Sequence, residues 1–212
     1  MVARKSIRLI ALASMLTCAT TLHASWKPEP LEGELEISEA LAACPESLRE
    51  LAGAYVLTES GFVLARKSEN GFHAIISRSQ PGAFEPQCLD AEGSRSLLHQ
   101  ILMRGRLQMQ GLDADEIESQ ITSAWTNGEL QAPTRPGINY MLSEKNRVPI
   151  APDQVIPYQP HLMFYAPDLT NEDFGGSVEG TSPVFLINEG KPDAYVIVPV
   201  STRPAEPSAE SD

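Results

Sequence analysis

A short, almost unbroken hydrophobic stretch spans residues 160–167 and is closed by a proline at each end. Apolar runs of this length between strand breakers are typical of a strand that is buried on both faces. Proline stops strand pairing because it lacks the backbone N–H group that a β-ladder needs. The pattern therefore predicts a central strand with a neighbouring strand on each side.

Short apolar segments separated by turn residues precede this run. Their pattern predicts two short helices over 38–43 and 46–52, followed by strands over 54–57, 62–66 and 72–77. Asn70-Gly71 is the dipeptide that most strongly favours a two-residue hairpin turn, and it directly precedes the third strand. We therefore expect these three strands to form an antiparallel meander.

The middle of the chain has the spacing of two amphipathic helices. The first begins near residue 94, and its apolar stripe consists of Leu97, Leu98, Ile101 and Leu102. Gly111 ends this helix, whereas Asp113 and Glu116 form a capping pair for the second, which Gly128 ends. A glycine inside a helix costs about 1 kcal/mol of helix propensity, so we expect another element to cross closely at Gly105.

The second half of the chain is punctuated by prolines. Its pattern predicts a strand over 138–143, the central strand, and a final hairpin over 184–187 and 194–200. Segments 81–93, 144–159 and 171–180 are expected to be loops. The fold class that follows is α+β: a single domain over residues 37–202, with a mainly antiparallel sheet and an inserted helical hairpin.

Residues 1–24 have the composition of a signal peptide. Its features are a positive start (Arg4, Lys5 and Arg8), an apolar stretch over 9–19, and small residues for cleavage before Ser25. The apolar stretch is shorter than the roughly 20 residues of a membrane-spanning helix. Cys18 raises lipid anchoring as an alternative, although Thr17 stands where a smaller residue is normal. We expect export to the periplasm or the extracellular space.

The charge of the chain narrows the classes of partner. The formal net charge is −12 and becomes −15 without residues 1–24, because 13 Lys and Arg then face 28 Asp and Glu. So acidic a protein repels nucleic acid and anionic lipid headgroups. No segment after the leader is predicted to insert into a membrane. Residues 25–36 are expected to be flexible, and residues 203–212 to be a disordered tail.

Two cysteines, Cys44 and Cys88, follow the leader. In an oxidising compartment an even pair is most simply a disulfide. Closing a loop of this length stabilises a fold by about 4 kcal/mol on the chain-entropy model. The alternatives are a reactive thiol, for which no local base is near, and two unpaired structural thiols.

Several residues are candidates for a functional site, although CxxC, HExxH, P-loop and GxGxxG motifs are all missing. His161 is a candidate catalytic base or metal ligand at one end of the central strand, or else a histidine that is hydrogen-bonded there. The acids Glu85, Asp90 and Glu92 are candidate ligands for a divalent cation, or part of a solvated loop. We predict no confident metal site and no specific cofactor.

Other side chains are candidates for binding a ligand. Tyr140 and Tyr165 are expected to line a pocket with His161 or to serve as strand packing. Arg135 lies in a rigid setting between two prolines, where it binds either a ligand carboxylate or the acidic segment. His73 is a weaker candidate. Residues 175–179 begin like a nucleophile elbow but lack its final glycine.

Five strings resemble a group of exported bacterial proteins of unknown function. They are Asn70-Gly71-Phe72 and the segments 85–93, 135–143, 160–167 and 197–200. The resemblance covers most of the chain from residue 70 to residue 200. The resemblance implies that these residues form one domain, and it carries no activity or assigned site.

The leading hypothesis is an exported soluble protein that binds a small ligand or another protein without catalysis. The first alternative is a metal-dependent or acid/base hydrolase that uses His161 with Asp90 or Glu92. The second is an envelope structural or assembly factor. A contact between His161 and one of the two acids would favour the hydrolase, and a histidine bonded only to backbone would count against it.

Overall fold

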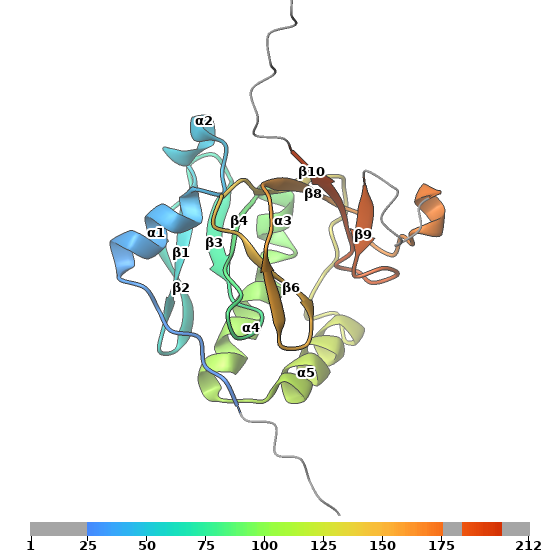
Figure 1. Cartoon of the computed structure of the whole chain (residues 1–212), viewed down its shortest axis with the longest axis horizontal. Coiled ribbons are helices and arrows are strands. Elements are labelled where there is room, and N and C mark those ends of the chain that lie inside the picture. Colours follow the sequence, from blue (N-terminus) through green and yellow to red (C-terminus); the bar gives the residue numbers. More distant parts are fainter. Residues whose placement is uncertain (1–24, 176–183, 201–212) are drawn as a thin grey trace, which may run out of the picture.

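The computed structural model describes residues 25–175 and 184–200 (Figure 1). Its main feature is one eight-stranded sheet. The strand order is β2-β1-β3-β4-β5-β8-β10-β9, and β6 and β7 form a separate two-stranded hairpin. The strands are β1 (Gly53–Thr58), β2 (Gly61–Arg66), β3 (His73–Ser77), β4 (Glu85–Leu89), β5 (Ile138–Met141), β6 (Arg147–Ala151), β7 (Gln154–Pro157), β8 (His161–Tyr165), β9 (Phe185–Ile187) and β10 (Tyr195–Pro199). The helices are α1 (Gly33–Leu41), α2 (Glu46–Arg49), α3 (Ala91–Arg95), α4 (Leu98–Gln110), α5 (Ala114–Thr126) and the 3₁₀ turn η1 (Glu172–Phe174).

The α+β class is confirmed, because helices accompany one large and mostly antiparallel sheet. Helices α4 and α5 lie between β4 and β5 in the chain, although these strands are neighbours in the sheet. They are therefore an inserted helical pair, joined by buried apolar side chains such as Leu107 and Ile121. Within the described ranges, no helix has the length and apolar character needed to cross a bilayer.

The predicted meander is wrong in its second pairing. β1 and β2 are antiparallel as expected, but β3 pairs with the other side of β1 in parallel, from Gly53 and His73 onward. Asn70-Gly71 therefore does not form a hairpin turn. The Asn70 amide donates to the Leu48 carbonyl and its oxygen accepts from the Phe72 N–H, which leads the chain across the end of β1.

Two predicted loops contain regular structure. Segment 81–93 includes β4 and the start of α3, and segment 144–159 includes the hairpin of β6 and β7. Pro86 is tolerated in β4 because β5 pairs only with Cys88 and Leu89, which leaves the other side of residue 86 without a ladder. In the sequence, this proline and the nearby acids obscure the alternation of side chains that would have marked β4 as a strand.

The N-terminal boundaries also differ from expectation. α1 begins at Gly33 rather than at residue 38, so residues 33–36 belong to a helix and not to the segment predicted to be flexible. The reason is Glu36, which is fully buried and receives two hydrogen bonds from Arg78 of the chain after β3. α2 ends at Arg49, three residues earlier than predicted.

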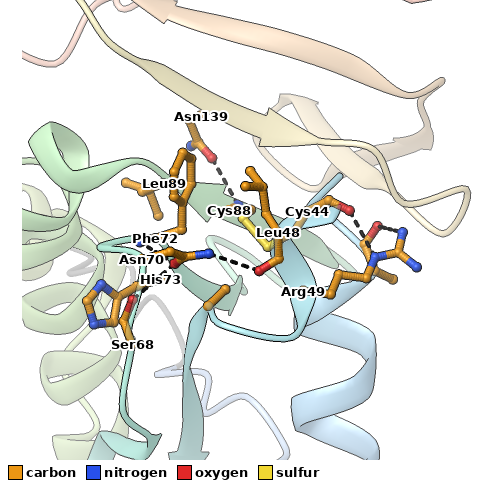
Figure 2. Close-up of a disulfide and its surroundings, with 12 residues drawn as sticks. Cys44, Leu48, Arg49, Ser68, Asn70, Phe72, His73, Cys88, Leu89 and Asn139 are labelled. Carbon is orange, nitrogen blue, oxygen red and sulfur yellow. Dashed lines mark hydrogen bonds between the residues drawn. A yellow bond between two sulfur atoms is a disulfide. The ribbon is translucent and has the colours of Figure 1, made fainter. Parts of the chain in front are cut away.

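The sheet has two differently covered faces. α1 packs on one face of the β1, β3 and β4 half, where Ala40, Ala74 and Ile76 form a buried cluster. α4 contributes to the cluster on the opposite face, where Leu97 and Leu98 meet β3, β4, β5, β8 and β10. The disulfide between Cys44 and Cys88 is confirmed and ties the segment after α1 to β4 (Figure 2).

The central strand β8 has a neighbour on each side, as predicted, and these neighbours are β5 and β10. The prediction that this strand is buried on both faces is wrong. Its side chains alternate between buried and more accessible positions, and Phe164 is 41 % exposed. The cause is the extent of α1, which covers β1, β3 and β4 but not β8.

The end of the first long helix and the start of the second are confirmed, whereas the helix expected from residue 94 is split into α3, which ends at Arg95, and α4, which begins at Leu98. Asp113 and Glu116 form a reciprocal capping box at the start of α5, and Gly111 ends α4 in the left-handed region with φ of 85°. A Cβ atom on Gly105 would lie 2.5 Å from the Phe62 ring of β2. The expected close crossing is therefore the contact of α4 with β2.

Candidate functional site

Asp90 and Tyr165 come together in a bonded junction and not in an open site. The Asp90 carboxylate caps α3 through the Gly93 N–H at 2.8 Å and also accepts from the Ile138 N–H at 3.0 Å. The Tyr165 hydroxyl lies 2.9 Å from the same carboxylate. Burial raises the pKa of Tyr165, and the neighbouring Tyr195 and Asp90 raise it further, so the hydroxyl stays a neutral donor. The junction joins α3, β5 and β8.

Glu92 is the centre of a second bonded junction. Its carboxylate is 2 % exposed and receives hydrogen bonds from Arg95 at 2.6 Å and from the Thr134 N–H at 2.5 Å. The Arg135 guanidinium lies 3.2 Å from the Glu92 carboxylate. Of the two roles predicted for this arginine, the structure therefore shows the pairing with the acidic segment. Burial alone would raise the pKa of Glu92, but these donors and the Arg95 charge outweigh it and lower the pKa to about 2.

His161 is not assembled with either acid. Its Nδ1 lies 2.9 Å from the Gln159 carbonyl oxygen, and it pairs with Met141 at the first position of β8. Asp90 contacts Tyr165 at the other end of the strand, four residues or about 13 Å away. Among the described residues, no group of three or more His, Cys, Asp or Glu side chains is arranged to hold a metal ion.

Tyr140 and His73 have other partners than His161. Tyr140 packs near Phe72 in the cluster under α1, on the sheet face opposite to Met141 and His161. The His73 Nδ1 lies 3.0 Å from the Ser94 hydroxyl. The suspected nucleophile elbow at 175–179 lies outside the described residues except for its first glycine.

A cavity of about 750 Å³ lies against the face of the sheet that carries His161. Met141, Met163 and Ile197 provide an apolar floor from β5, β8 and β10. The walls come from α4, α5, the β6 strand and β9. About half of the lining residues are polar, among them Glu85, Gln87, Tyr158, His161 and Asp193. A cavity of this size, with an apolar floor and polar groups on its walls, is large enough for a small molecule.

Strand alternation places these side chains. β4, β5 and β8 point every second residue toward the cavity, which sends Gln87, Met141 and His161 to one face. The Asn139 amide donates to the Gln87 side-chain oxygen at 2.7 Å, and the Asn139 oxygen accepts from the Cys88 N–H (Figure 2). This chain of bonds fixes the orientation of both amides, so the Gln87 Nε2 is a donor.

His161 presents an acceptor. A carbonyl oxygen only accepts, so Nδ1 carries the proton in the bond to Gln159. Burial lowers the pKa of His161, and the Gln159 bond opposes this only in part, so the ring is neutral. Nε2 then has a free lone pair and no partner among the described residues. The Tyr158 ring lies edge-on to the imidazole, with centroids 5.0 Å apart.

Glu85 is the acid of the predicted acidic segment that reaches the cavity. One of its oxygens accepts from the Ser79 hydroxyl at 2.7 Å and from the Ser79 N–H at 3.1 Å. Burial raises the pKa of Glu85, while the Ser79 bonds and the more distant Arg104 charge act in the opposite direction. Of the three acids grouped by sequence, Glu85 alone lines this space.

Sequence reasoning identified His161 but missed Gln87, Tyr158 and Asp193. Alternation along β4 would have paired Gln87 with Leu89 on one face, had the strand been recognised. Asp193 and Tyr158 lie outside regular strands, and no local pattern marks them. Comparison with protein-family models, with curated proteins and with solved structures found no significant match to this chain.

Proposed function

We propose that the chain is an exported protein that binds a small, partly apolar molecule in the cavity above β5, β8 and β10. The cavity carries the proposal, since about 750 Å³ falls within the usual range of ligand sites, roughly 300 to 1,000 Å³. The signal-peptide composition of residues 1–24 and the disulfide support export.

The chemistry of the lining supports binding more than catalysis. His161 is a neutral acceptor, but the acids that were expected to assist it, Asp90 and Glu92, are engaged about one strand length away. A catalytic histidine is commonly oriented by a carboxylate, whereas a backbone carbonyl, that of Gln159, takes this place at His161, and Glu85 is held by Ser79. The lining is suited to holding an apolar body and orienting it through a few hydrogen bonds.

A neutral fluorescent probe, N-phenyl-1-naphthylamine, tests this proposal. We expect its fluorescence to rise on addition of the protein, with a saturable binding curve. Val148 of β6 lines the cavity and packs, only partly buried, against the edge of the core cluster, so Val148→Trp narrows the cavity from its wall. The variant should bind the probe about tenfold more weakly, equivalent to about 1.4 kcal/mol.

Leu64→Trp is the matched control, because Leu64 is exposed on the edge strand β2, far from the cavity in strand order. Thermal melting of both variants checks that they fold. Absence of saturable binding to the native protein, or equal affinity in the Val148→Trp variant, would contradict the proposal.

A further inference from the structure

We infer that the ligand of this cavity is a neutral molecule with an apolar body and a secondary amide, whose N–H group donates to His161 Nε2 and whose carbonyl accepts from Gln87 Nε2. The inference rests on the proposed binding function and names the class of molecule that would be bound. Three features support it: an unused hydrogen-bonding group on each of these two buried side chains, their places in the sheet register, and the apolar floor between and beside them.

Gln87 and His161 are 8 % and 3 % exposed, and both line the cavity. The Gln87 oxygen accepts from Asn139, so its Nε2 is a donor, whereas the proton on His161 Nδ1 leaves Nε2 as an acceptor. Neither Nε2 has a hydrogen-bond partner in the ranges 25–175 and 184–200. Within the same ranges, Asn146 Oδ1 is the one unpartnered side-chain polar atom that is cut off from the surface, so both Nε2 atoms keep accessible area. The cavity is the open space that these two side chains border.

The strand register places the donor and the acceptor in one row across the sheet. Met141 of β5 pairs with His161 of β8. The pairing of Cys88 with Tyr140, continued by one residue, puts Gln87 of β4 opposite Met141. All three side chains of this row line the cavity. Gln87 and His161 are therefore two strand spacings apart, about 10 Å, with Met141 between them.

A trans amide matches a donor and an acceptor at this spacing. Its N–H and C=O groups point in opposite directions, as they do in a peptide unit that bonds to a strand on each side. With a hydrogen bond of about 2.9 Å at each end, an amide bridges two groups that are roughly 8 Å apart, which is comparable with the spacing of the row. An ester of the same shape keeps the carbonyl for Gln87 but leaves His161 Nε2 without a donor.

The surface around the row favours a neutral ligand with an apolar body. Met141, Met163 and Ile197 form the floor, and thioether side chains adapt well to different shapes. A charged ligand group on this floor would lose its water without gaining a counter-charge, because Gln87 and the His161 ring are both neutral. An anion would be repelled further, since three acids and one arginine line the cavity.

Three compounds of similar shape test the inference: N-methyl-4-phenylbutanamide, methyl 4-phenylbutanoate and the 4-phenylbutanoate anion, measured by isothermal titration calorimetry on the purified protein. The amide and the ester differ only by an N–H group in place of an oxygen. We expect the amide to bind about tenfold more tightly than the ester, and the carboxylate more weakly than the ester. The ratio of amide to ester affinity is the readout. A cavity without a suitable acceptor would favour the ester, because the amide N–H would lose its hydrogen bond to water.

Two variants separate the two hydrogen bonds. In His161→Asn the asparagine amide takes the place of Nδ1 as a donor, but no atom stands at the Nε2 position. The ratio should therefore fall to about one or below, while the ester affinity changes less than about twofold. Gln87→Met keeps the length of the side chain without its N–H donor, so the amide and the ester should both bind about fivefold more weakly at an unchanged ratio.

His99→Asn is the matched control, because His99 is exposed on α4 and does not line the cavity. It should leave both affinities unchanged. Thermal melting checks that each variant folds. Gln87→Met leaves the Asn139 amide without its acceptor. If that variant does not fold, the ratio in the native protein and in the His161 variant decides.

The outcomes separate this inference from the proposed function. If N-phenyl-1-naphthylamine or the ester binds but the amide is no tighter than the ester, the amide class is wrong and the binding function stands. A carboxylate that binds more tightly than the ester overturns the neutral class. A ratio that is unchanged in His161→Asn overturns the role of His161, and native affinities in Gln87→Met overturn the role of Gln87. If neither the fluorescent probe nor any of the three compounds binds, both proposals fail.

Discussion

Arg78 places two nitrogens on the two carboxylate oxygens of Glu36, each at 2.8 Å, across 42 residues of sequence. Both side chains are buried, at 6 % and 0 % exposure. Glu36 also accepts from the Leu31 and Leu57 N–H groups, and the Gln108 amide donates to the Arg78 carbonyl. The ion pair and the further hydrogen bonds of its two residues thus connect α1, β1 and α4.

Replacing Glu36 by glutamine should destabilise the protein by about 3–5 kcal/mol, because Arg78 would remain buried without a counter-charge. The measurement is urea unfolding at neutral pH. Glu39→Gln is the control on the same helix: Glu39 pairs with Lys145, which is 65 % exposed, so its loss should cost less than about 1 kcal/mol. A double-mutant cycle with Arg78→Met should give a coupling energy of about 2 kcal/mol. Additive single effects would contradict the pairing.

Loss of the Cys44–Cys88 bridge should lower the free energy of unfolding by about 4 kcal/mol, because it closes a loop over a sequence separation of 44 residues. The double variant Cys44→Ala with Cys88→Ala is compared with the native protein by urea unfolding. In the denatured, unreduced full chain, thiol titration should find only Cys18. Three titratable thiols would show that the bridge does not form.

Gly105→Ala should destabilise the protein by about 1–2 kcal/mol, although alanine has the better helix propensity. The added methyl group would meet the Phe62 ring at 2.5 Å. Adding Phe62→Leu should recover part of the loss, which thermal unfolding can measure. Ser123→Ala on the exposed side of α5 is the propensity control. A more stable Gly105→Ala variant would show that the crossing tolerates a side chain.

Glu92 should make the protein sensitive to acid. Its pKa is lowered from 4.5 to about 2, so its stabilising contribution is complete above pH 4.5 and is lost as the pH falls toward 2. Urea midpoints measured between pH 6 and pH 2 should fall less steeply in the Glu92→Gln variant. Parallel pH profiles of the two proteins would show that Glu92 does not cause the loss of stability in acid.

The α+β class, the two long helices and the final hairpin were accessible from local patterns. Gly111, Asp113 and Gly128 mark helix ends through their own chemistry, which does not depend on distant residues. The disulfide followed from cysteine count and expected compartment. The tight crossing at Gly105 was likewise visible, because a helical glycine is costly without a packing reason.

Strand partners and the cavity were not accessible in this way. β3 lies parallel to β1 because Asn70 bonds across to Leu48, a tertiary contact that overrides a hairpin dipeptide. β4 carries Pro86, which is acceptable only because β5 stops short of it. Glu85, Asp90 and Glu92 looked alike in sequence, but strand and helix directions send them to three different environments.

The order of strands in the sheet has a consequence for folding during synthesis. In the sheet β3 adds to β1, β4 to β3, β5 to β4 and β8 to β5. Each of these strands pairs with one that was synthesised earlier, so the sheet can lengthen at one edge as the chain emerges. Both Cys44 and Cys88 are available before β8 and β10 exist. The cavity floor is therefore completed last, because Met163 and Ile197 lie on the late strands β8 and β10.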